Sequence, residues 1–447
     1  MTVRDQDAPQ CPACGAFLPN DTGHVDRISW WLDPTAILPI ELDHTDLGLD
    51  SAVFEGFLRS FHIDSTQKAR TLEQAYRLVQ RYLAPFVVKV VVDMTADLVR
   101  AIDDDPGTTV VFLGRDGFVF GFVLSVLAPD FYARHCVPMY LPRPLADAAL
   151  RDLESWTGSD FSAIEAFRRR SSAPTGTAGA WQQLTAYFEL SGIDIDGGDV
   201  DLCLVDSGLK GSVQEMLTAA YPAASFFGHY AFFAASAHDP HPGTKRGHAL
   251  HLDGHHSADG LALQGDLPED PELTFHHHEA IVAIEGMISG SKSSPTGYGT
   301  NGRPRARRHR HDERPLDGIN PALVAPEHAD PYVREAIFAM NVIAIVHYAR
   351  TLAPTVTAAG PEWYRSAEGT RWYKELSERS DLLRDQVRAW VARSDAADPG
   401  FARLLDSFIP RADKDDIRDL DERLRSADLT DEQRQGIWRT VTQLYRR

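Results

Sequence analysis

The sequence predicts an α/β protein built on a mostly parallel sheet with helices on both faces. Two observations support this fold class. Apolar segments of strand length alternate with helical segments from about residue 108 to 236, and charged or glycine-rich loops directly follow the strands. A chain of 447 residues, of which 43 % are hydrophobic, is long enough for such a core with helical additions at both ends.

Changes in composition divide the chain into four predicted parts. Residues 1–63 form an N-terminal segment, and residues 64–236 form the α/β core. Residues 237–330 are rich in histidine, glycine and basic side chains and contain one helix, and residues 331–447 form a helical subdomain. No internal repeat is evident.

Charge and apolar patterning narrow the class of ligand. The net charge of −19 argues against a general nucleic-acid binder, which needs clustered cations to displace counterions from phosphates. The chain has no uninterrupted apolar run of about 18 residues, and its first residues lack the apolar stretch of a signal peptide. We therefore expect a cytoplasmic protein that binds a small molecule and does not bind a membrane. The oligomeric state stays open.

Two cysteines near the start have the spacing of a zinc knuckle. Cys11 and Cys14 lie in the segment CPACG, and His24 and His44 are the nearest residues that would complete four ligands. The alternative is a pair of reduced thiols in a surface turn, which is the default state of the four cysteines in a chain of this length.

Two helices are expected before the first strand. Apolar residues fall on one helical face between residues 64 and 86. The next segment, VVKVVVDMTADLVRAI, is rich in β-branched residues, but its length and the spacing of Leu98 and Ile102 favour a helix.

The first two predicted strands both end near an arginine. TVVFLG is followed by Arg115, Asp116 and an apolar helix, and VPMYL is followed by Pro142 and Arg143. Because the ends of parallel strands lie along one edge of a sheet, Arg115 and Arg143 are expected to converge on one anionic ligand. The alternative is that each pairs with a nearby aspartate, such as Asp116 or Asp147.

Helices are expected between residues 145 and 190, interrupted by the loop SSAPTGTAGA. This loop is either a lid over a site or a simple connection. The segment SFFGHYAFFAAS predicts a further buried strand.

The most informative stretch is DLCLVDSGLKGSVQEML, residues 201–217. Its apolar start predicts a buried strand that ends at Asp206, and a helix is expected from Val213. Between them we expect a loop that binds an anion with backbone N–H groups at the helix start. The loop residues expected to bind a phosphate are Ser207, Gly208, Lys210, Gly211 and Ser212. The alternative is an ordinary connection that uses glycine only for its geometry.

Two later features of the sequence are candidate binding sites for a metal or an anion. His276 and Glu279 have the i, i+3 spacing that metal sites use, although such histidines are more often solvent-facing. A basic run from Arg303 to Arg310 is expected to be a loop, either solvated or clamping phosphate or carboxylate groups. The helices predicted from Pro331 onward begin with an apolar one that should be buried.

The strand–loop–helix units at GRDG (114–117) and VDSGLKGS (205–212) resemble the pattern of type I phosphoribosyltransferases. The resemblance implies that the first loop holds pyrophosphate. It also implies that Asp206 faces the ribose hydroxyls, while Lys210, Gly211 and Ser212 bind the 5-phosphate of phosphoribosyl pyrophosphate. Mg²⁺ is the cofactor that such a substrate implies. The family usually has two adjacent acidic residues, and here the second is Ser207.

The motifs FLGRDG, MYLPRPL, VDSGLKGSVQ and EAIVAIEGMISGSKSSPTGYGTNGRP are also similar to another family. This is the domain that follows a haloacid dehalogenase-like unit in bacterial proteins of surface-polysaccharide clusters, and the similarity covers roughly residues 80–310. The dehalogenase motif DxDxT is absent from the sequence.

The leading hypothesis is a biosynthetic enzyme that transfers a phosphoribosyl or glycosyl group from a small phosphorylated substrate. Asp206, Arg115 and Asp116 are the expected catalytic residues, and Arg143 is expected to help bind the phosphate. One alternative is a phosphate-ester hydrolase with Asp93 or Asp116 as nucleophile. Another is a binding or scaffold protein without turnover.

Overall fold

The computed structural model describes most of the chain between residues 57 and 408. The gaps are residues 60, 169–176, 237–238, 253–274, 276–277, 290–293, 296, 305–323, 361 and 366, and beyond 408 it describes 424, 427–434 and 436–437. The predicted zinc ligands Cys11 and Cys14, most of the expected lid, His276 and most of the basic run lie outside the described residues.

A five-stranded sheet forms the centre of the described structure. Its strands are β1 (Thr109–Leu113), β2 (Cys136–Met139), β3 (Asp201–Leu209), β4 (Ser225–Ala234) and β5 (Lys245–Leu252). Their order across the sheet is β2-β1-β3-β4-β5, and every neighbouring pair is parallel. The predicted α/β class with a parallel sheet is therefore confirmed. The order changes direction between β1 and β3, the position where doubly wound sheets bind ligands.

Alternate side chains of each central strand enter two separate apolar cores. Val110 and Phe112 of β1 belong to one cluster, whereas Val111 and Leu113 belong to the other. Successive side chains of a strand point to opposite faces, so both faces of the sheet are buried. This explains why the strand segments of the sequence are continuously apolar.

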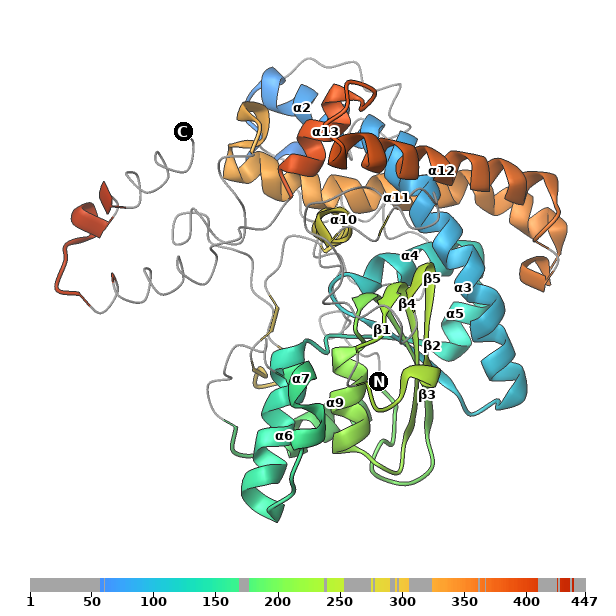
Figure 1. Cartoon of the computed structure of the whole chain (residues 1–447), viewed down its shortest axis with the longest axis vertical. Helices are drawn as coiled ribbons and strands as arrows, with labels where there is room; N and C mark the ends of the chain where they lie inside the picture. The colour runs from blue at the N-terminus through green and yellow to red at the C-terminus, as the bar shows by residue number, and fades with distance from the viewer. Residues whose placement is uncertain are drawn as a thin grey trace.

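Helices cover both faces, as predicted (Figure 1). One face carries α3 (Ala84–Asp104), α4 (Gly117–Leu127), α5 (Pro129–His135), α10 (His278–Ile288) and α11 (Pro331–Ala359). The other face carries α6 (Arg143–Thr157), α7 (Glu165–Arg168), α8 (Ala180–Leu190) and α9 (Ser212–Ala220). Short helical turns lie at Ser162–Ile164, Pro242–Thr244, Pro326–His328 and Trp363–Arg365.

The helices expected before the first strand form one nearly continuous segment. Ser65 caps α2 (Thr66–Leu78) by accepting a hydrogen bond from the backbone N–H of Lys68. A π-helical turn, η4 (Val79–Leu83), connects α2 to α3. The preference for helix over strand in VVKVVVDMTADLVRAI is thus confirmed, because these residues lie within α3.

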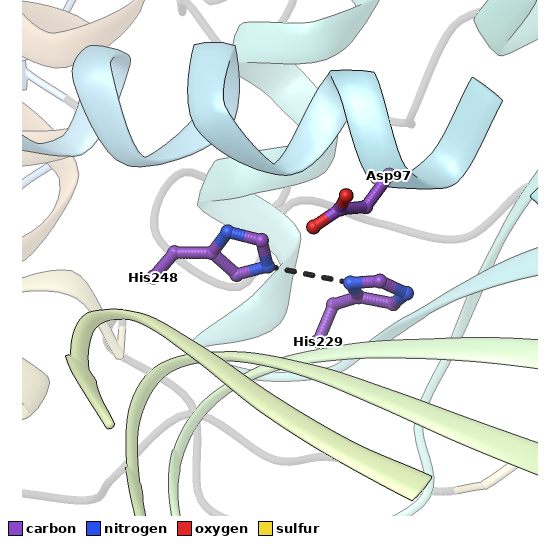
Figure 2. A group of neighbouring side chains, drawn as sticks. All are labelled: Asp97, His229 and His248. Atoms are coloured by element: carbon purple, nitrogen blue, oxygen red, sulfur yellow. Dashed lines mark hydrogen bonds between the residues drawn. The ribbon is translucent and has the colours of Figure 1, made fainter. Parts of the chain in front are cut away.

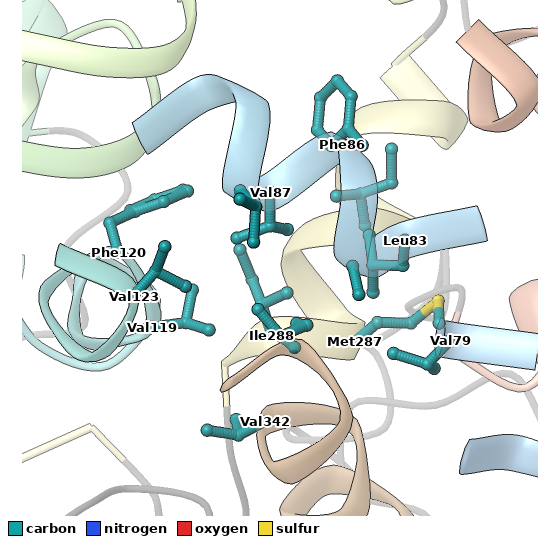
Figure 3. Packing of buried hydrophobic residues seen from close by; sticks show 14 of the residues in the cluster. Val79, Leu83, Phe86, Val87, Val119, Phe120, Val123, Met287, Ile288 and Val342 are labelled. Carbon is teal, nitrogen blue, oxygen red and sulfur yellow. The ribbon is translucent and has the colours of Figure 1, made fainter. Parts of the chain in front are cut away.

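The C-terminal helices pack on the same core as the sheet. The helices α11, α12 (Arg371–Val391) and α13 (Pro399–Asp406) belong to the apolar cluster that also contains α2, α3 and α4. Figure 3 shows side chains from η4, α3, α4, α10 and α11 meeting in this cluster. Residues 331–447 are predicted to form a helical subdomain, and the described part of that range contains α11, α12 and α13. These helices share their core with the α/β unit.

Helix α11 is long and apolar enough to cross a membrane by length and composition. Most of its apolar window is buried, and the helix contacts α2, α3 and α4. No other helix among the described residues meets both criteria.

The predicted core boundary at residue 236 is too early, because β5 (Lys245–Leu252) adds a fifth strand to the sheet. The sequence of this segment does not predict a strand because its composition is polar. Among the described residues β5 pairs with β4 alone and lies at the edge of the sheet, so several of its side chains stay partly or fully exposed, among them Arg246 and His251.

Candidate functional site

The predicted site residues gather where β1 and β3 end at the reversal of strand order. Asp116 immediately precedes α4, while Asp206 and Ser207 lie near the end of β3. Arg143 is the first residue of α6 rather than the end of a strand, because β2 already ends at Met139. Glu285 reaches the same place from α10. Four separate elements therefore build the site.

The predicted loop after Asp206 is shorter than the sequence suggested. Ser207, Gly208 and Leu209 continue β3, and Gly208 pairs with Phe232 of β4. Gly208 has a φ of +146°, and a Cβ there would lie 2.2 Å from the carbonyl oxygen of Phe232. Ser207 and Gly208 were expected in a phosphate-binding loop. That expectation is wrong for their conformation, because pairing with β4 keeps them extended.

The remaining turn consists of Lys210 and Gly211, and Ser212 begins α9. Gly211 has a φ of +67°, and a Cβ there would lie 2.6 Å from Cε of Lys245. Lys245 is buried and forms ion pairs with Glu215 of α9 and with Asp239. The helix start is thus held against β5 by a buried cation that sequence reasoning did not single out.

Ser207 lies at the centre of a hydrogen-bonded cluster of acidic residues. Its Oγ is 3.1 Å from Oδ2 of Asp116 and 3.2 Å from Oε1 of Glu285. Its backbone N–H donates to Oδ1 of Asp206 over 2.8 Å. A hydroxyl has one proton to donate, so it satisfies both carboxyl groups only if one of them is protonated and donates to Oγ. The arrangement therefore favours a proton shared within the cluster.

The electrostatics of the cluster agree with a shared proton. Burial, and then the charge of Asp116, raises the pKa of Glu285 to about 7. Burial, and then the charge of Asp116, also raises the pKa of Asp206 well above its ordinary value. Burial raises the pKa of Asp116 as well, although Arg115, Ser207 and Arg143 act against this rise. Glu285 can therefore gain or lose a proton near neutral pH.

Both predicted arginines act on these carboxyl groups. Arg115 and Arg143 each lower the pKa of Asp116 and of Glu285 by their positive charge. The alternative pairing of Arg143 with Asp147 is wrong. Asp147 is buried and instead binds Arg151 at 2.9 Å and Arg168 at 2.7 Å. The site thus combines three carboxyl groups with two guanidinium groups, and Lys210 follows β3 directly.

Glu285 is the functional candidate that sequence reasoning missed. The sequence predicts its helix, but the residue spacing indicates His276 and Glu279, at the start of that helix, as the candidate ligands. The available signal was the residue itself, a single charged side chain within the apolar run AIVAIEGMI. A buried acidic residue in such a helix needs a polar partner, and Ser207 provides it.

Asp93, the alternative nucleophile, does not belong to this site. It lies on α3, where Lys89 donates to its Oδ2 over 2.6 Å and Tyr373 donates to its Oδ1 over 2.8 Å. Both carboxylate oxygens are therefore occupied by structural partners from the helical layer.

Fold and site together define an α/β protein with an acidic and basic cluster at the switch point of a doubly wound parallel sheet. No protein-family model matches the chain, and no curated protein matches it.

Proposed function

We propose that the chain is an enzyme that binds a sugar phosphate or nucleotide-like substrate and transfers its glycosyl or phosphoribosyl group. One observation carries the proposal. Asp116, Ser207 and Glu285 are joined by hydrogen bonds where β1 and β3 end, within the electrostatic reach of Arg115 and Arg143. Such a site offers groups for both the hydroxyls and the phosphates of one ligand.

The charges suit chemistry at an anomeric carbon. As the bond from that carbon to the leaving phosphate oxygen breaks, positive charge builds on the sugar and negative charge on the phosphate. Arg115 and Arg143 would stabilise the leaving group, and Asp206 would hold the sugar hydroxyls. Lys210 and the start of α9 would bind a second phosphate. The acceptor then forms the new bond to the anomeric carbon and loses a proton to the carboxyl cluster.

Glu285 supplies a carboxyl group near the position where the phosphoribosyltransferase-like motif lacks its second acidic residue. Ser207 replaces that residue, yet the carboxyl group of Glu285 lies 3.2 Å from the Ser207 hydroxyl. A distant helix therefore supplies a carboxylate beside the position where the motif lacks one.

The donor set fits Mg²⁺, which prefers oxygen ligands and one or two carboxylates together with substrate phosphates. Asp116 and Asp206 would hold the ion, and Oδ1 of Asp116 is buried without a hydrogen-bond partner. When bound, Mg²⁺ would neutralise phosphate charge and relieve the mutual repulsion of the carboxylates.

Calorimetric titration with phosphoribosyl pyrophosphate, with and without Mg²⁺, tests the proposal. We expect the wild type to bind, and we expect Asp206→Asn and Arg143→Met to bind at least about tenfold more weakly. The matched control is Arg134→Met, which removes an exposed arginine from α5. Absence of binding to the wild type at millimolar ligand, or equal binding by all variants, would overturn the proposal.

A second candidate function is hydrolysis of a phosphate ester with Asp116 as nucleophile. The observation in its favour is that Oδ1 of Asp116 has no hydrogen-bond partner while Ser207 holds Oδ2. Phosphate release from a generic phosphomonoester, abolished in Asp116→Asn, would select this function. Ligand binding without turnover of any substrate would select a binding protein.

A further inference from the structure

A second cluster of polar side chains lies between α3 and the edge of the sheet. Asp97 of α3, His229 of β4 and His248 of β5 place one ligand atom each within 4.8 Å of one another. Figure 2 shows the two imidazole rings rising from neighbouring strands toward the carboxylate of Asp97, which points at them from the helix. The cluster shares no residue with the carboxyl cluster around Ser207.

The spacing of the two imidazoles matches a tetrahedral metal site. Nδ1 of His229 and Nε2 of His248 are 3.3 Å apart. Two nitrogen ligands about 2.05 Å from a zinc ion, at the tetrahedral angle, are separated by about 3.3 Å. The two nitrogens are thus already at the separation that zinc requires, whereas ligands at right angles would be closer together.

Burial favours the neutral form of both imidazole rings. Burial lowers the pKa of His229 to about 4, with Arg246 acting in the same direction and Asp97 against it. Burial and the neighbouring His229 lower the pKa of His248 well below its ordinary value.

Asp97 is oriented by one arginine and approached by another. Nη1 of Arg100 donates to its Oδ1 over 2.8 Å, the kind of outer contact that orients a metal ligand. Nη1 of Arg246 lies 2.9 Å from Oδ2, but Oδ2 is buried without a hydrogen bond of good geometry. The Arg246 side chain is 59 % exposed and is free to move toward solvent when another cation takes its place.

We propose that Asp97, His229 and His248 form a zinc site that fastens α3 to β4 and β5, with water as the fourth ligand. Two imidazoles and one carboxylate are a ligand set that zinc accepts, and the fourth position of such a site takes water. The ion would cross-link three elements that are distant in sequence, and it would bind only the folded chain. Zinc binding should therefore raise the stability of the fold.

The test is zinc titration of the full chain after removal of bound metal with a chelator, using a competing fluorescent indicator. Because Cys11 and Cys14 are also zinc candidates, the background is the Cys11→Ser, Cys14→Ser double variant. We expect one zinc ion per chain in this background, and at least about a hundredfold weaker binding after His229→Ala or His248→Gln. His251→Ala is the matched control, because His251 also lies on β5 but is not part of the cluster.

Two further readouts separate a metal site from a structural hydrogen-bond cluster. Arg246→Gln removes the competing cation, so it should tighten zinc binding. Cobalt in the same background should show the visible bands of a tetrahedral ion without thiolate charge transfer. Unchanged zinc affinity in His229→Ala and His248→Gln, or no binding in the background protein, would overturn the proposal. These readouts do not depend on catalytic activity, so the zinc site can fail while the proposed function stands, and the reverse also holds.

Discussion

Replacing Glu285 with glutamine keeps the size of the side chain and removes its charge. The amide can donate to the Ser207 hydroxyl, as the protonated acid does, so Glu285→Gln preserves the contact that measures 3.2 Å in the wild type. What changes is the electrostatic cost of a buried carboxylate beside Asp116.

The size of that cost follows from the pKa of Glu285, which is raised from 4.5 to about 7. Between these two values the folded chain binds a proton that the unfolded chain has lost, so wild-type stability falls as pH rises through this window. Each pH unit corresponds to about 1.4 kcal/mol, which gives about 3 kcal/mol in total. Because the Glu285 side chain is largely but not fully buried, we expect solvent screening to leave about 2 kcal/mol.

Urea unfolding between about pH 4.5 and about pH 8.5 measures this difference. Near the acid end, Glu285→Gln and wild type should have similar free energies of unfolding. Near the alkaline end, the variant should be the more stable by about 2 kcal/mol, and it should bind the substrate less well. The control Glu189→Gln removes an exposed carboxylate from α8. A Glu285→Gln difference that stays constant with pH, or that reverses sign, would refute the assignment of a raised pKa to Glu285.

Three other expectations concern stability. Gly208→Ala should lower the free energy of unfolding by roughly 2–4 kcal/mol, because the new Cβ would meet the Phe232 carbonyl. Gly158 has a φ of +73° and open space around it, so Gly158→Ala should lower the free energy of unfolding by only about 1 kcal/mol. Equal losses in urea unfolding would contradict this expectation. The pKa of His229 is lowered to about 4, so the folded chain resists protonation that the unfolded chain accepts. Its contribution to stability should therefore be fully present above about pH 6.5 and be lost as pH falls toward about 4, and His229→Gln should flatten that part of a melting-temperature profile. Arg168→Met should destabilise the fold by about 3–5 kcal/mol because it removes a buried cation that lies 2.7 Å from the fully buried carboxylate of Asp147. Calorimetric melting that shows no loss would indicate that the pair is not buried in solution.

Local patterns in the sequence were enough to predict the two units that carry the candidate site. A short apolar strand, small or charged residues and an apolar helix follow one another at 109–127 and again at 201–220, and both units have this form in the structure. Such patterns depend on neighbours within a few residues, so they can be found without a fold. They also placed Asp116 and Ser207 at the same edge of the sheet.

Local patterns did not show where β3 ends or that β5 exists. Ser207 and Gly208 resemble loop residues, and only their pairing with β4 keeps them in a strand. The polar edge strand Lys245–Leu252 likewise becomes a strand through its neighbour rather than through its own composition.

The sequence by itself determined the fold class and the two strand–loop–helix units that carry Asp116 and Ser207, because hydrophobic periodicity is a local property. Only the tertiary structure decided which side chains contact one another. In the folded chain Glu285 of α10 lies beside Ser207. Asp147 forms ion pairs with Arg151 and Arg168 rather than with Arg143. Three separate elements bring Asp97, His229 and His248 together. Contacts between residues far apart in the chain form only when the elements pack. The chemistry of both proposed sites therefore depends on packing that a single sequence does not encode locally.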